Sequence, residues 1–318
     1  MTVNLGVWRT PVEPAPRLAE AIGLEPGDLW LKRDDYLAAG GGGSKLRKLV
    51  HLLDVAREED ATVVVACGAA QSNFARLAAA SARRLGMEAV LLLRGDGPGR
   101  EIGNVSLAGL FGADVRWVGD VGLAELDELA EVVGNALRTK GERPYVLPYG
   151  GSDVLGARGY VDCAEELREQ APKLEHVVVP VGSGGTMAGL VAGLGTAKVL
   201  GIEVGAVQDA GHRIAKLAGQ MGEPATPSSL RLRAEQIGQG YGAMTAAARR
   251  AMLLAAHTAG LILDPVYGAK AMAGLMAAVK DGAIQAGERT VFVCTGGLPG
   301  LLGHSAAYEL SAMTRPAT

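Results

Sequence analysis

Short runs of apolar residues alternate with longer amphipathic stretches along most of this chain. Apolar runs rich in β-branched residues predict buried strands, whereas apolar positions that recur every three or four residues predict helices. The expected strands cover residues 29–33, 62–66, 89–93, 115–118, 145–147, 176–181, 202–207 and 290–294. The expected helices start at Lys45 and just after Asn73, the latter ending near Leu85, and cover residues 104–110, 123–137, 153–169, 187–194, 243–257 and 269–279. Strands that alternate with helices form parallel sheets covered on both faces, so the pattern predicts an α/β fold.

One stretch combines a flexible backbone with a cluster of cations. Four glycines, residues 40–43, precede Ser44, and the apolar spacing that begins at Leu46 predicts a helix starting near Lys45. The neighbouring cations Arg47 and Lys48 and the positive end of the helix dipole both disfavour protonation of Lys45. The amine of Lys45 is therefore predicted to be a nucleophile of the kind that forms a Schiff base. A solvated basic helix end after a loop is the plainer interpretation of the same stretch.

Composition narrows the class of protein. The chain has 318 residues, 48% of them hydrophobic, which is enough for a large core and for two domains. Its net charge of −3, with basic and acidic residues interleaved, gives no basic field for nucleic acid, and we expect no nucleic-acid partner. No apolar run is long enough for a signal peptide or a membrane span, so a cytoplasmic protein without a membrane partner is expected.

Cysteines and histidines do not form a recognisable metal or redox motif. Cys67, Cys163 and Cys294 lie far apart, without a CxxC pair, and are predicted to be buried thiols. The five histidines are scattered as well, which makes a metal centre or a histidine-based triad an improbable interpretation.

A second glycine-rich stretch follows the predicted strand at residues 176–181. Gly182, Ser183, Gly184, Gly185 and Thr186 lead into a helix, and backbone amides at such a turn form a cradle for an anion. The hydroxyl groups of Ser183 and Thr186 can add further hydrogen-bond donors. An ordinary glycine turn is the alternative. The stretch lacks the third glycine of a dinucleotide motif, so a small monophosphate is the better ligand.

Two further groups of polar residues stand at the predicted ends of strands. Gln71, Ser72 and Asn73 follow the strand at 62–66, where they could cap the next helix or bind a carboxylate or a phenolic oxygen. Tyr241 and Tyr267 lie on loops, the first among glycines, where a phenol can act as a general acid or base when cationic neighbours lower its pKa. A buried tyrosine with a satisfied hydroxyl is the alternative for each.

The last strand ends on a hydroxyl group. Thr295 follows residues 290–294 and precedes two glycines, and its hydroxyl can bond to a ring nitrogen without protonating it. These motifs, together with residues 10–11 and 31–35, occur in the order and spacing of one family. The chain resembles the D-cysteine desulfhydrase and 1-aminocyclopropane-1-carboxylate deaminase family, whose members are pyridoxal-phosphate enzymes of the tryptophan-synthase-like fold, fold type II. The resemblance extends over nearly the whole chain.

The resemblance implies a role for each matching residue. Lys45 resembles the Schiff-base lysine, which also moves the α-proton, and residues 182–186 resemble the phosphate-binding loop. It places Asn73 at the phenolic oxygen of the cofactor and Thr295 at the pyridine nitrogen. Gln71, Ser72 and Asn73 are implied to bind an amino-acid substrate, with Gln71 and Ser72 at its carboxylate. The catalytic residues implied beside Lys45 are Ser72, whose hydroxyl would also lie near the α-carbon, and Tyr241 and Tyr267 near the substrate. The resemblance also implies a large domain of residues 1–47 and 160–318, a small inserted domain of residues 48–159, and a homodimer.

The expected reaction is α,β-elimination from a small amino acid such as D-cysteine, giving pyruvate, ammonia and sulfide. Three positions depart from the family pattern, namely Ser44, Phe74 and Gly268. Gly268 stands where the deaminases carry glutamate and the desulfhydrases threonine, which argues against opening of a cyclopropane ring. Sulfite release from cysteate, cyclopropane ring opening, and a non-catalytic cofactor-binding protein remain alternatives.

Overall fold

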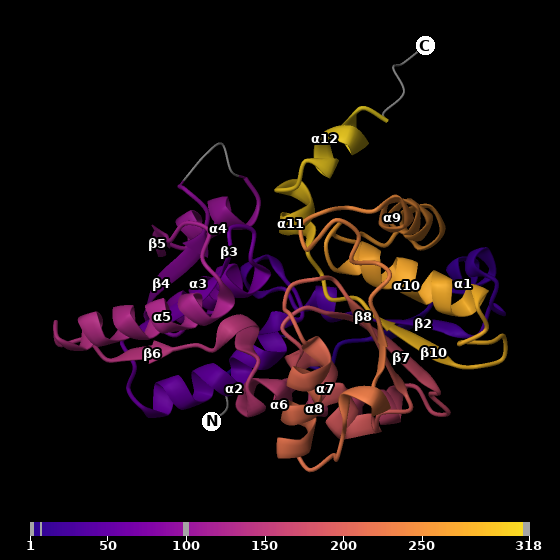
Figure 1. Cartoon of the computed structure of the whole chain (residues 1–318), viewed down its shortest axis with the longest axis horizontal. Coiled ribbons are helices and arrows are strands. Elements are labelled where there is room, and N and C mark those ends of the chain that lie inside the picture. The colour runs from indigo at the N-terminus through magenta and orange to yellow at the C-terminus, as the bar shows by residue number, and fades with distance from the viewer. Residues whose placement is uncertain (1–2, 7, 98–101, 314–318) are drawn as a thin grey trace.

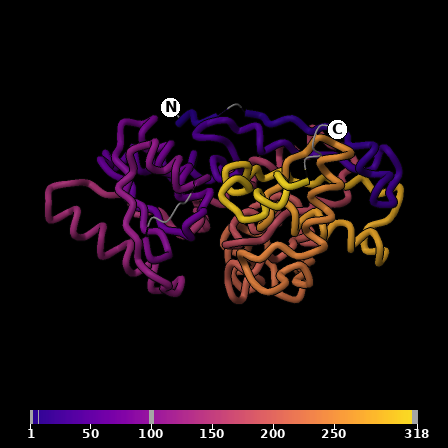
Figure 2. The backbone as a smooth tube through the Cα atoms, turned by 90° about the horizontal axis from the view of Figure 1, so that it is seen from above, coloured from indigo at the N-terminus to yellow at the C-terminus, as the bar shows by residue number. Residues whose placement is uncertain are grey.

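The strands of the protein form two separate sheets, seen in a computed structural model that describes residues 3–6, 8–97 and 102–313 (Figure 1). The larger sheet has six strands in the order β1-β2-β10-β7-β8-β9, and the smaller has four in the order β5-β4-β3-β6. We call the two halves of the molecule the large lobe and the small lobe after these sheets. Seen from above, the lobes lie side by side (Figure 2).

The large lobe is built on a sheet that is parallel except at one edge. Its strands are β1 (Val12–Pro14), β2 (Leu29–Lys32), β7 (His176–Val181), β8 (Val199–Glu203), β9 (Arg231–Arg233) and β10 (Thr290–Val293). Strand β1 pairs antiparallel with β2 and ends on a proline, which has no amide to donate and is tolerated at an edge. The remaining pairs are parallel, as the sequence pattern predicts.

Helices cover both faces of this sheet, and the side chains of β7 show why. Val177, Val179 and Val181 pack against α6 (Val154–Gln170), α7 (Gly185–Leu194) and α8 (Ala210–Gln220). Val178 points the other way, toward α1 (Pro16–Ile22), α9 (Ala246–Ala259) and α10 (Gly268–Lys280). Successive side chains of a strand alternate between faces, so a nearly continuous apolar run is what a strand covered on both sides requires.

The small lobe repeats the arrangement with parallel strands only. Strands β3 (Val63–Ala69), β4 (Glu88–Arg94), β5 (Asp114–Trp117) and β6 (Pro144–Val146) are covered on one face by α2 (Lys45–Glu58), α3 (Asn73–Arg84) and α4 (Asn104–Leu110). Helix α5 (Leu123–Arg138) covers the other face. The predicted domain limits, residues 48–159, stay a prediction.

The structure differs from the sequence pattern in several places. Strand β8 begins at Val199, because it pairs in register with Val177 of β7, and not at residue 202 as its apolar run predicts. Helix α7 begins two residues earlier than predicted. The pattern also missed α1, β1, α8, β9, the terminal helices α11 (Leu298–Leu302) and α12 (Ala306–Ser311), and the 3-10 turns Asp34–Tyr36, Ala39–Gly41, Tyr149–Gly151 and Pro227–Ser229. Within the described ranges no helix has the length and apolar character needed to cross a bilayer.

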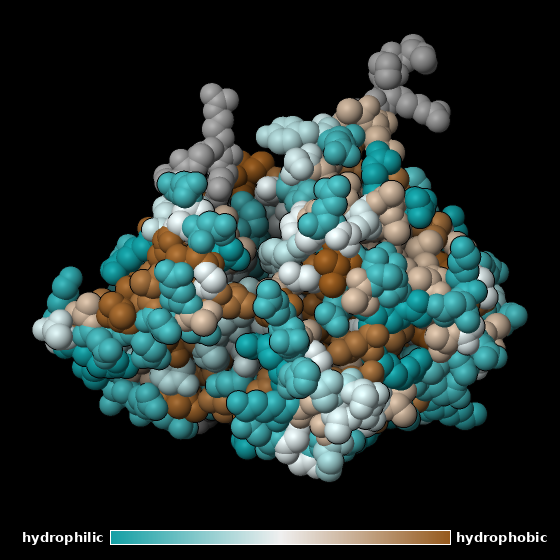
Figure 3. Space-filling model, in the orientation of Figure 1, coloured by the Kyte–Doolittle hydropathy of each residue, from teal (hydrophilic) through white to brown (hydrophobic). Residues whose placement is uncertain are grey.

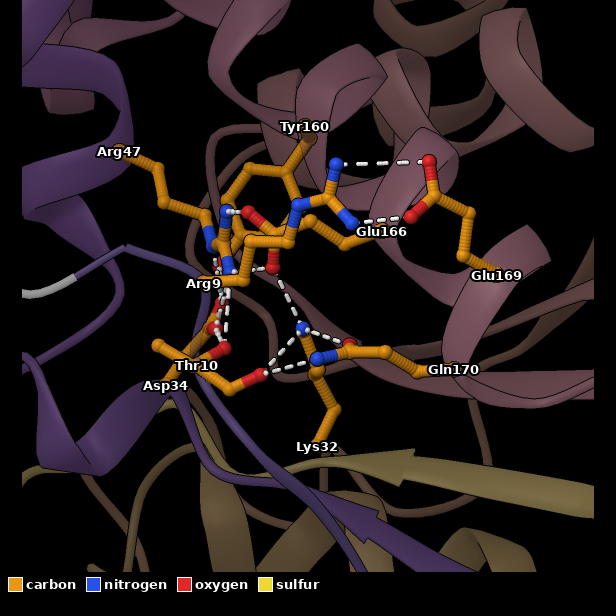
Figure 4. A network of polar contacts seen from close by, with 9 residues as sticks. All are labelled: Arg9, Thr10, Lys32, Asp34, Arg47, Tyr160, Glu166, Glu169 and Gln170. Atoms are coloured by element: carbon orange, nitrogen blue, oxygen red, sulfur yellow. Dashed lines mark hydrogen bonds and ion pairs between the residues drawn. The ribbon is translucent and has the colours of Figure 1, made fainter.

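A buried ionic network joins α2 to the large lobe (Figure 4). The guanidinium of Arg47 donates to both carboxylate oxygens of Glu166, each at 2.9 Å, and its Nη2 and Nε donate to Asp34 at 2.8 Å. Glu166 also accepts from Lys32 Nζ at 2.5 Å. The tyrosine hydroxyl of Tyr160 donates to Asp34 at 3.0 Å. Four charged side chains from β2, the following turn, α2 and α6 thereby satisfy one another away from water.

Removing one member of this network is expected to be costly. Glu166→Ala should lower the free energy of unfolding by about 3–5 kcal/mol, because it leaves the cations of Lys32 and Arg47 short of a buried partner. Denaturant unfolding measures the change. The control is Glu169→Ala one turn away, whose exposed pair with Arg9 should contribute about 1 kcal/mol or less. Equal losses in the two variants would contradict the assignment.

Candidate active site

A pocket lies between the lobes, where the surface is hollowed (Figure 3), and the ends of three parallel strands meet at it. The segments that follow β3, β7 and β10 all contribute to its wall, which is where parallel sheets present their ligands. Its lining includes Gly43, Ser44, Lys45, Cys67, Ser72, Asn73, Phe74, Tyr149, Gly182, Ser183, Gly184, Thr186, Tyr241, Asp264, Tyr267 and Thr295. Most of the residues singled out in the sequence therefore meet in one place.

The glycine loop before Lys45 has a conformation that other residues rarely adopt. Gly40, Gly41, Gly42 and Gly43 have φ angles of 61°, 87°, 80° and 128°, all in the left-handed region. The loop passes close to the end of β10, where the amide of Ser44 donates to the carbonyl of Thr295 at 3.1 Å. These two features bring the first turn of α2 into the pocket, so four consecutive glycines are a requirement of this backbone.

Burial sets the protonation of Lys45. Removal from water lowers the pKa of its amine from 10.5 to about 8, and the nearby carboxylate of Asp264 opposes this shift. The sequence-based explanation invoked the charges of Arg47 and Lys48, and it was wrong in its cause. Arg47 turns away into the ionic network, while Lys48 points to the opposite wall. Desolvation makes the Lys45 amine a better nucleophile than an exposed lysine.

The loop after β7 has the geometry that an anion cradle requires. Gly185 and Thr186 are the first two residues of α7, and Gly184, with a φ of 91°, caps that helix without a side-chain bond. The free amides and positive dipole of a helix start favour an anion. Ser183 Oγ lies 2.6 Å from the hydroxyl of Ser152, which also accepts from the amide of Gly185 at 3.3 Å.

Lys48 places a second buried amine behind this cradle, and sequence reasoning missed it. Its Nζ is buried and donates to Ser152 Oγ at 2.8 Å and to the carbonyl of Gly150 at 3.1 Å. A Cβ placed on Gly185 would lie 2.9 Å from the same Nζ, so only glycine leaves room there. Burial, and then the charge of Lys45, lower the pKa of Lys48. The available signal was its spacing, since a residue three positions after Lys45 is one helical turn away.

Of residues 71–73, two line the pocket and one bonds to the backbone at the start of α4. Ser72 Oγ accepts from the amide of Ala75 at 3.1 Å and caps α3, so the capping interpretation is confirmed, and the serine also lines the pocket. Asn73 lines the pocket too. Gln71 lies outside the lining, because its side chain donates to the carbonyl of Ile102 at 2.8 Å and accepts from the amide of Asn104 at 2.9 Å.

Tyr241 and Tyr267 form a pair. Their hydroxyl oxygens are 2.7 Å apart and their rings meet edge to face with centroids 5.7 Å apart. Desolvation raises the pKa of both phenols above the ordinary value. The condition that the sequence analysis set for acid–base chemistry, a pKa lowered by cationic neighbours, is not met, because burial dominates at both phenols. Each phenol keeps its proton and can donate it.

Asp264 is the carboxylate of the pocket, and it is bound to backbone. Its oxygens accept from the amides of Val266, Tyr267 and Gly268 at 3.1, 2.9 and 2.8 Å. Burial raises the pKa of Asp264, and these amide bonds oppose the rise. Gly268 therefore begins α10 with no side chain, and a Cβ there would lie 3.3 Å from an oxygen of Asp264. Sequence reasoning did not single out Asp264 as a site residue.

Two other departures from the family pattern occupy the same walls. Ser44 is buried at the start of α2, and Phe74 is buried with its ring edge against Gly151, where an added Cβ would lie 2.8 Å away. Cys67 also lines the pocket, and burial raises the pKa of its thiol to about 12, so the thiol is protonated. Cys163 and Cys294 are buried as predicted.

A desolvated lysine beside a helix-start cradle that is backed by a second buried amine fits one class of cofactor. An aldehyde would react with the amine of Lys45, while a phosphate would bind at the start of α7. Comparison with known proteins agrees. Residues 3–296 match the model of the family described as "Pyridoxal-phosphate dependent enzyme". The cofactor is accordingly pyridoxal 5'-phosphate.

Relatives narrow the family further. A D-cysteine desulfhydrase of Salmonella choleraesuis is 36% identical over 312 residues, covering 93% of each chain. A Pyrococcus furiosus protein provisionally named 1-aminocyclopropane-1-carboxylate deaminase is 35% identical over 311 residues, covering 94% of this chain and 92% of its own. A solved structure of a deaminase homologue (33% identity, 98% and 96% coverage) superposes with a TM-score of 0.87. This chain belongs to the 1-aminocyclopropane-1-carboxylate deaminase and D-cysteine desulfhydrase family, and the expected fold type is confirmed.

The depressed pKa of Lys45 gives a prediction about pH. The rate at which added pyridoxal phosphate reacts with cofactor-free protein should rise with pH and level off above about 8, because only the neutral amine attacks. Stopped-flow absorbance measures this rate. Lys45→Ala should abolish the reaction, and Lys216→Ala, which removes an exposed lysine, should not. A rate that keeps rising until about pH 10.5, the value of an exposed lysine, would contradict the burial argument.

Proposed function

We propose that the protein is a lyase that catalyses α,β-elimination from a small amino acid, with D-cysteine as the model substrate. The amino acid loses its α-proton and its β-substituent, and addition of water then releases a 2-oxo acid and ammonia. For D-cysteine the products are pyruvate, ammonia and hydrogen sulfide. One observation carries the proposal. A single pocket holds the amine of Lys45, whose pKa is lowered, and the protonated phenol pair of Tyr241 and Tyr267.

Lys45 is assigned the proton transfer at the α-carbon. When bound, pyridoxal phosphate withdraws electrons from that carbon and makes its proton acidic. Lys45 Nζ then accepts the proton, which an amine with a pKa of about 8 does readily near neutral pH. Ser72 is assigned to the substrate carboxylate. Its hydroxyl oxygen already accepts from Ala75, so its hydrogen is the part that remains to be donated.

The phenol pair is assigned the leaving group. In a pair of hydroxyls 2.7 Å apart, one donates to the other, and the second keeps its hydrogen for a group in the pocket. Desolvation keeps both Tyr241 and Tyr267 protonated, so a departing thiolate meets a hydrogen-bond donor that stabilises its charge. The pair is therefore assigned the stabilisation of the leaving group, and Lys45 is assigned the role of the base.

The remaining walls are assigned to the cofactor. Gly182, Ser183, Gly184, Gly185 and Thr186 bind its phosphate, with the buried amine of Lys48 behind them; Asn73 bonds to its phenolic oxygen and Thr295 to its ring nitrogen. A hydroxyl at the ring nitrogen leaves that nitrogen unprotonated, and the electron withdrawal is moderate. Moderate withdrawal favours loss of a β-substituent over a long-lived carbanion.

Ring opening of a cyclopropane amino acid is the weaker candidate for this pocket. That reaction needs additional acid and base groups, yet Gly268 has no side chain and the carboxylate of Asp264 is held by three backbone amides. Because the chain is similar to a protein provisionally named a deaminase, 1-aminocyclopropane-1-carboxylate must be included in the substrate assay. Cysteate, which would release sulfite, belongs in the same test.

The functional unit is proposed to be a homodimer. Exposed apolar side chains on α11 and α12, namely Leu298, Leu302 and Tyr308, offer surface that a second copy would cover. Light scattering on the purified protein should give twice the mass of one chain. A monomeric mass would contradict this part of the proposal.

Substrate assays of the holoenzyme test the reaction. We expect 2-oxo acid and ammonia from D-cysteine at a rate well above those with L-cysteine, cysteate and 1-aminocyclopropane-1-carboxylate. Lys45→Ala should abolish turnover, because it removes the base. Lys216→Ala should leave turnover unchanged. Faster turnover of cysteate, with release of sulfite, or of 1-aminocyclopropane-1-carboxylate would show that the substrate is that compound and not D-cysteine. No turnover with any of the four compounds would favour a non-catalytic cofactor-binding protein.

A further inference from the structure

Arg76 is a buried cation that lies outside the pocket lining and bonds to three of the segments around the pocket. It lies on α3 with 1% of its surface exposed. Its Nε donates to Asn104 Oδ1 at 2.8 Å, and its Nη2 donates to the carbonyl of Gly42 at 2.9 Å and to Asn73 Oδ1 at 3.3 Å. A further bond joins Nη1 to the carbonyl of Gly40. One guanidinium thus fixes the glycine loop, Asn73 and the start of α4.

The charge of Arg76 has no carboxylate partner in the described part of the chain. All of its hydrogen-bond acceptors there are neutral amide oxygens, whereas the other fully buried arginine, Arg47, is paired with Asp34 and Glu166. Burial lowers the pKa of Arg76 to about 10, so it is still charged at neutral pH. A buried charge without a counter-ion is costly, and an anion placed nearby would offset that cost.

Asn73 connects this charge to the pocket. Its Oδ1 accepts from Arg76 and from Asn104 Nδ2 at 3.0 Å, and both bonds hold the amide in one orientation. Asn104 is fixed in turn by Gln71, whose backbone carbonyl accepts from the same Nδ2 at 3.0 Å. Since the oxygen of the Asn73 amide is occupied from behind, its nitrogen is the end left to bond to a ligand in the pocket.

We propose that Arg76 is a positioning residue that acts on the cofactor through Asn73. It aims the amide nitrogen of Asn73 at the phenolic oxygen, and its charge, transmitted through the polarised amide, favours the anionic form of that oxygen. This inference rests on the proposed function, which places Asn73 at the phenolic oxygen. Bonds to charged groups are stronger than neutral ones and polarise their neighbours, which is why the arginine matters beyond its geometry.

A purely structural clamp would have a different signature. It would change the stability of the fold but not the proton affinity of the bound cofactor. Other ionisable groups around the pocket also bear on that affinity, namely Lys45, Lys48, Cys67, Tyr149, Tyr241, Asp264 and Tyr267, and none of them is altered by a substitution at Arg76. The pH midpoint of the visible absorbance band of the holoenzyme therefore separates the two roles.

The test is a spectroscopic titration of holoenzyme reconstituted with pyridoxal phosphate. Arg76→Met should move the midpoint of the visible band to higher pH by about one unit, because loss of the positive charge makes the proton bind about tenfold more tightly. Arg76→Lys, which keeps the charge, should move it less. Arg83→Met is the control, since Arg83 lies on the same helix and donates to the carbonyls of Phe111 and Gly112 at 2.9 and 2.7 Å, away from the pocket. It should leave the midpoint unchanged.

A second variant covers the case in which Arg76→Met does not fold. Asn104→Asp retains the arginine and its Nε acceptor but places a negative charge against it, so the midpoint should again rise. A normal band with an unchanged midpoint in Arg76→Met, or in Asn104→Asp if the former does not fold, would overturn the inference and leave the proposed function standing. Absence of any visible band from the unaltered protein would instead refute the placement of the cofactor at Lys45.

Discussion

The site depends on one constraint, which is that a lysine amine must be held out of water at the start of a helix. An ammonium group resists burial, and the fold accepts the amine because its pKa falls to about 8. The glycine loop makes this possible, since four left-handed φ angles turn the chain sharply enough for Ser44 to bond to the end of β10. A single β-carbon in this loop would disturb the geometry, because one on Gly42 would lie 2.9 Å from the carbonyl of Leu37.

Three neighbouring basic residues of α2 show how the position of a side chain on a helix determines its electrostatic surroundings. Lys45 faces the pocket. Lys48 lies one helical turn further along the chain and bonds to Ser152, whereas Arg47 points away from the pocket toward the carboxylate of Glu166. In the sequence they form one basic cluster, which predicts that Arg47 and Lys48 act together on the amine of Lys45. In the structure they serve different walls, and burial is the common influence on Lys45 and Lys48.

The sequence was most informative where local pattern and structure coincide. The bounds of α4 and β7 match the predicted ones, because apolar periodicity and flanking glycines determine them locally. The presence of the glycine loop after β7 and of Thr295 at the pocket could be predicted, because glycines after a buried strand are a local signal. The role of Lys48 could not, since its partner Ser152 is 104 residues away in the chain. The raised pKa of Tyr241 and Tyr267 was equally hidden, because it depends on burial by segments from both lobes.

The two ends of the pocket are carried by different helices. Helix α2 packs against the smaller sheet while its first turn is fixed to the large lobe through Ser44 and Arg47, and α7 packs against the larger sheet. A cofactor attached at both Lys45 and the start of α7 would be a crosslink between these elements as well as a reagent. Because it would bind the folded chain and not the unfolded one, its occupancy would add to the stability of the whole fold.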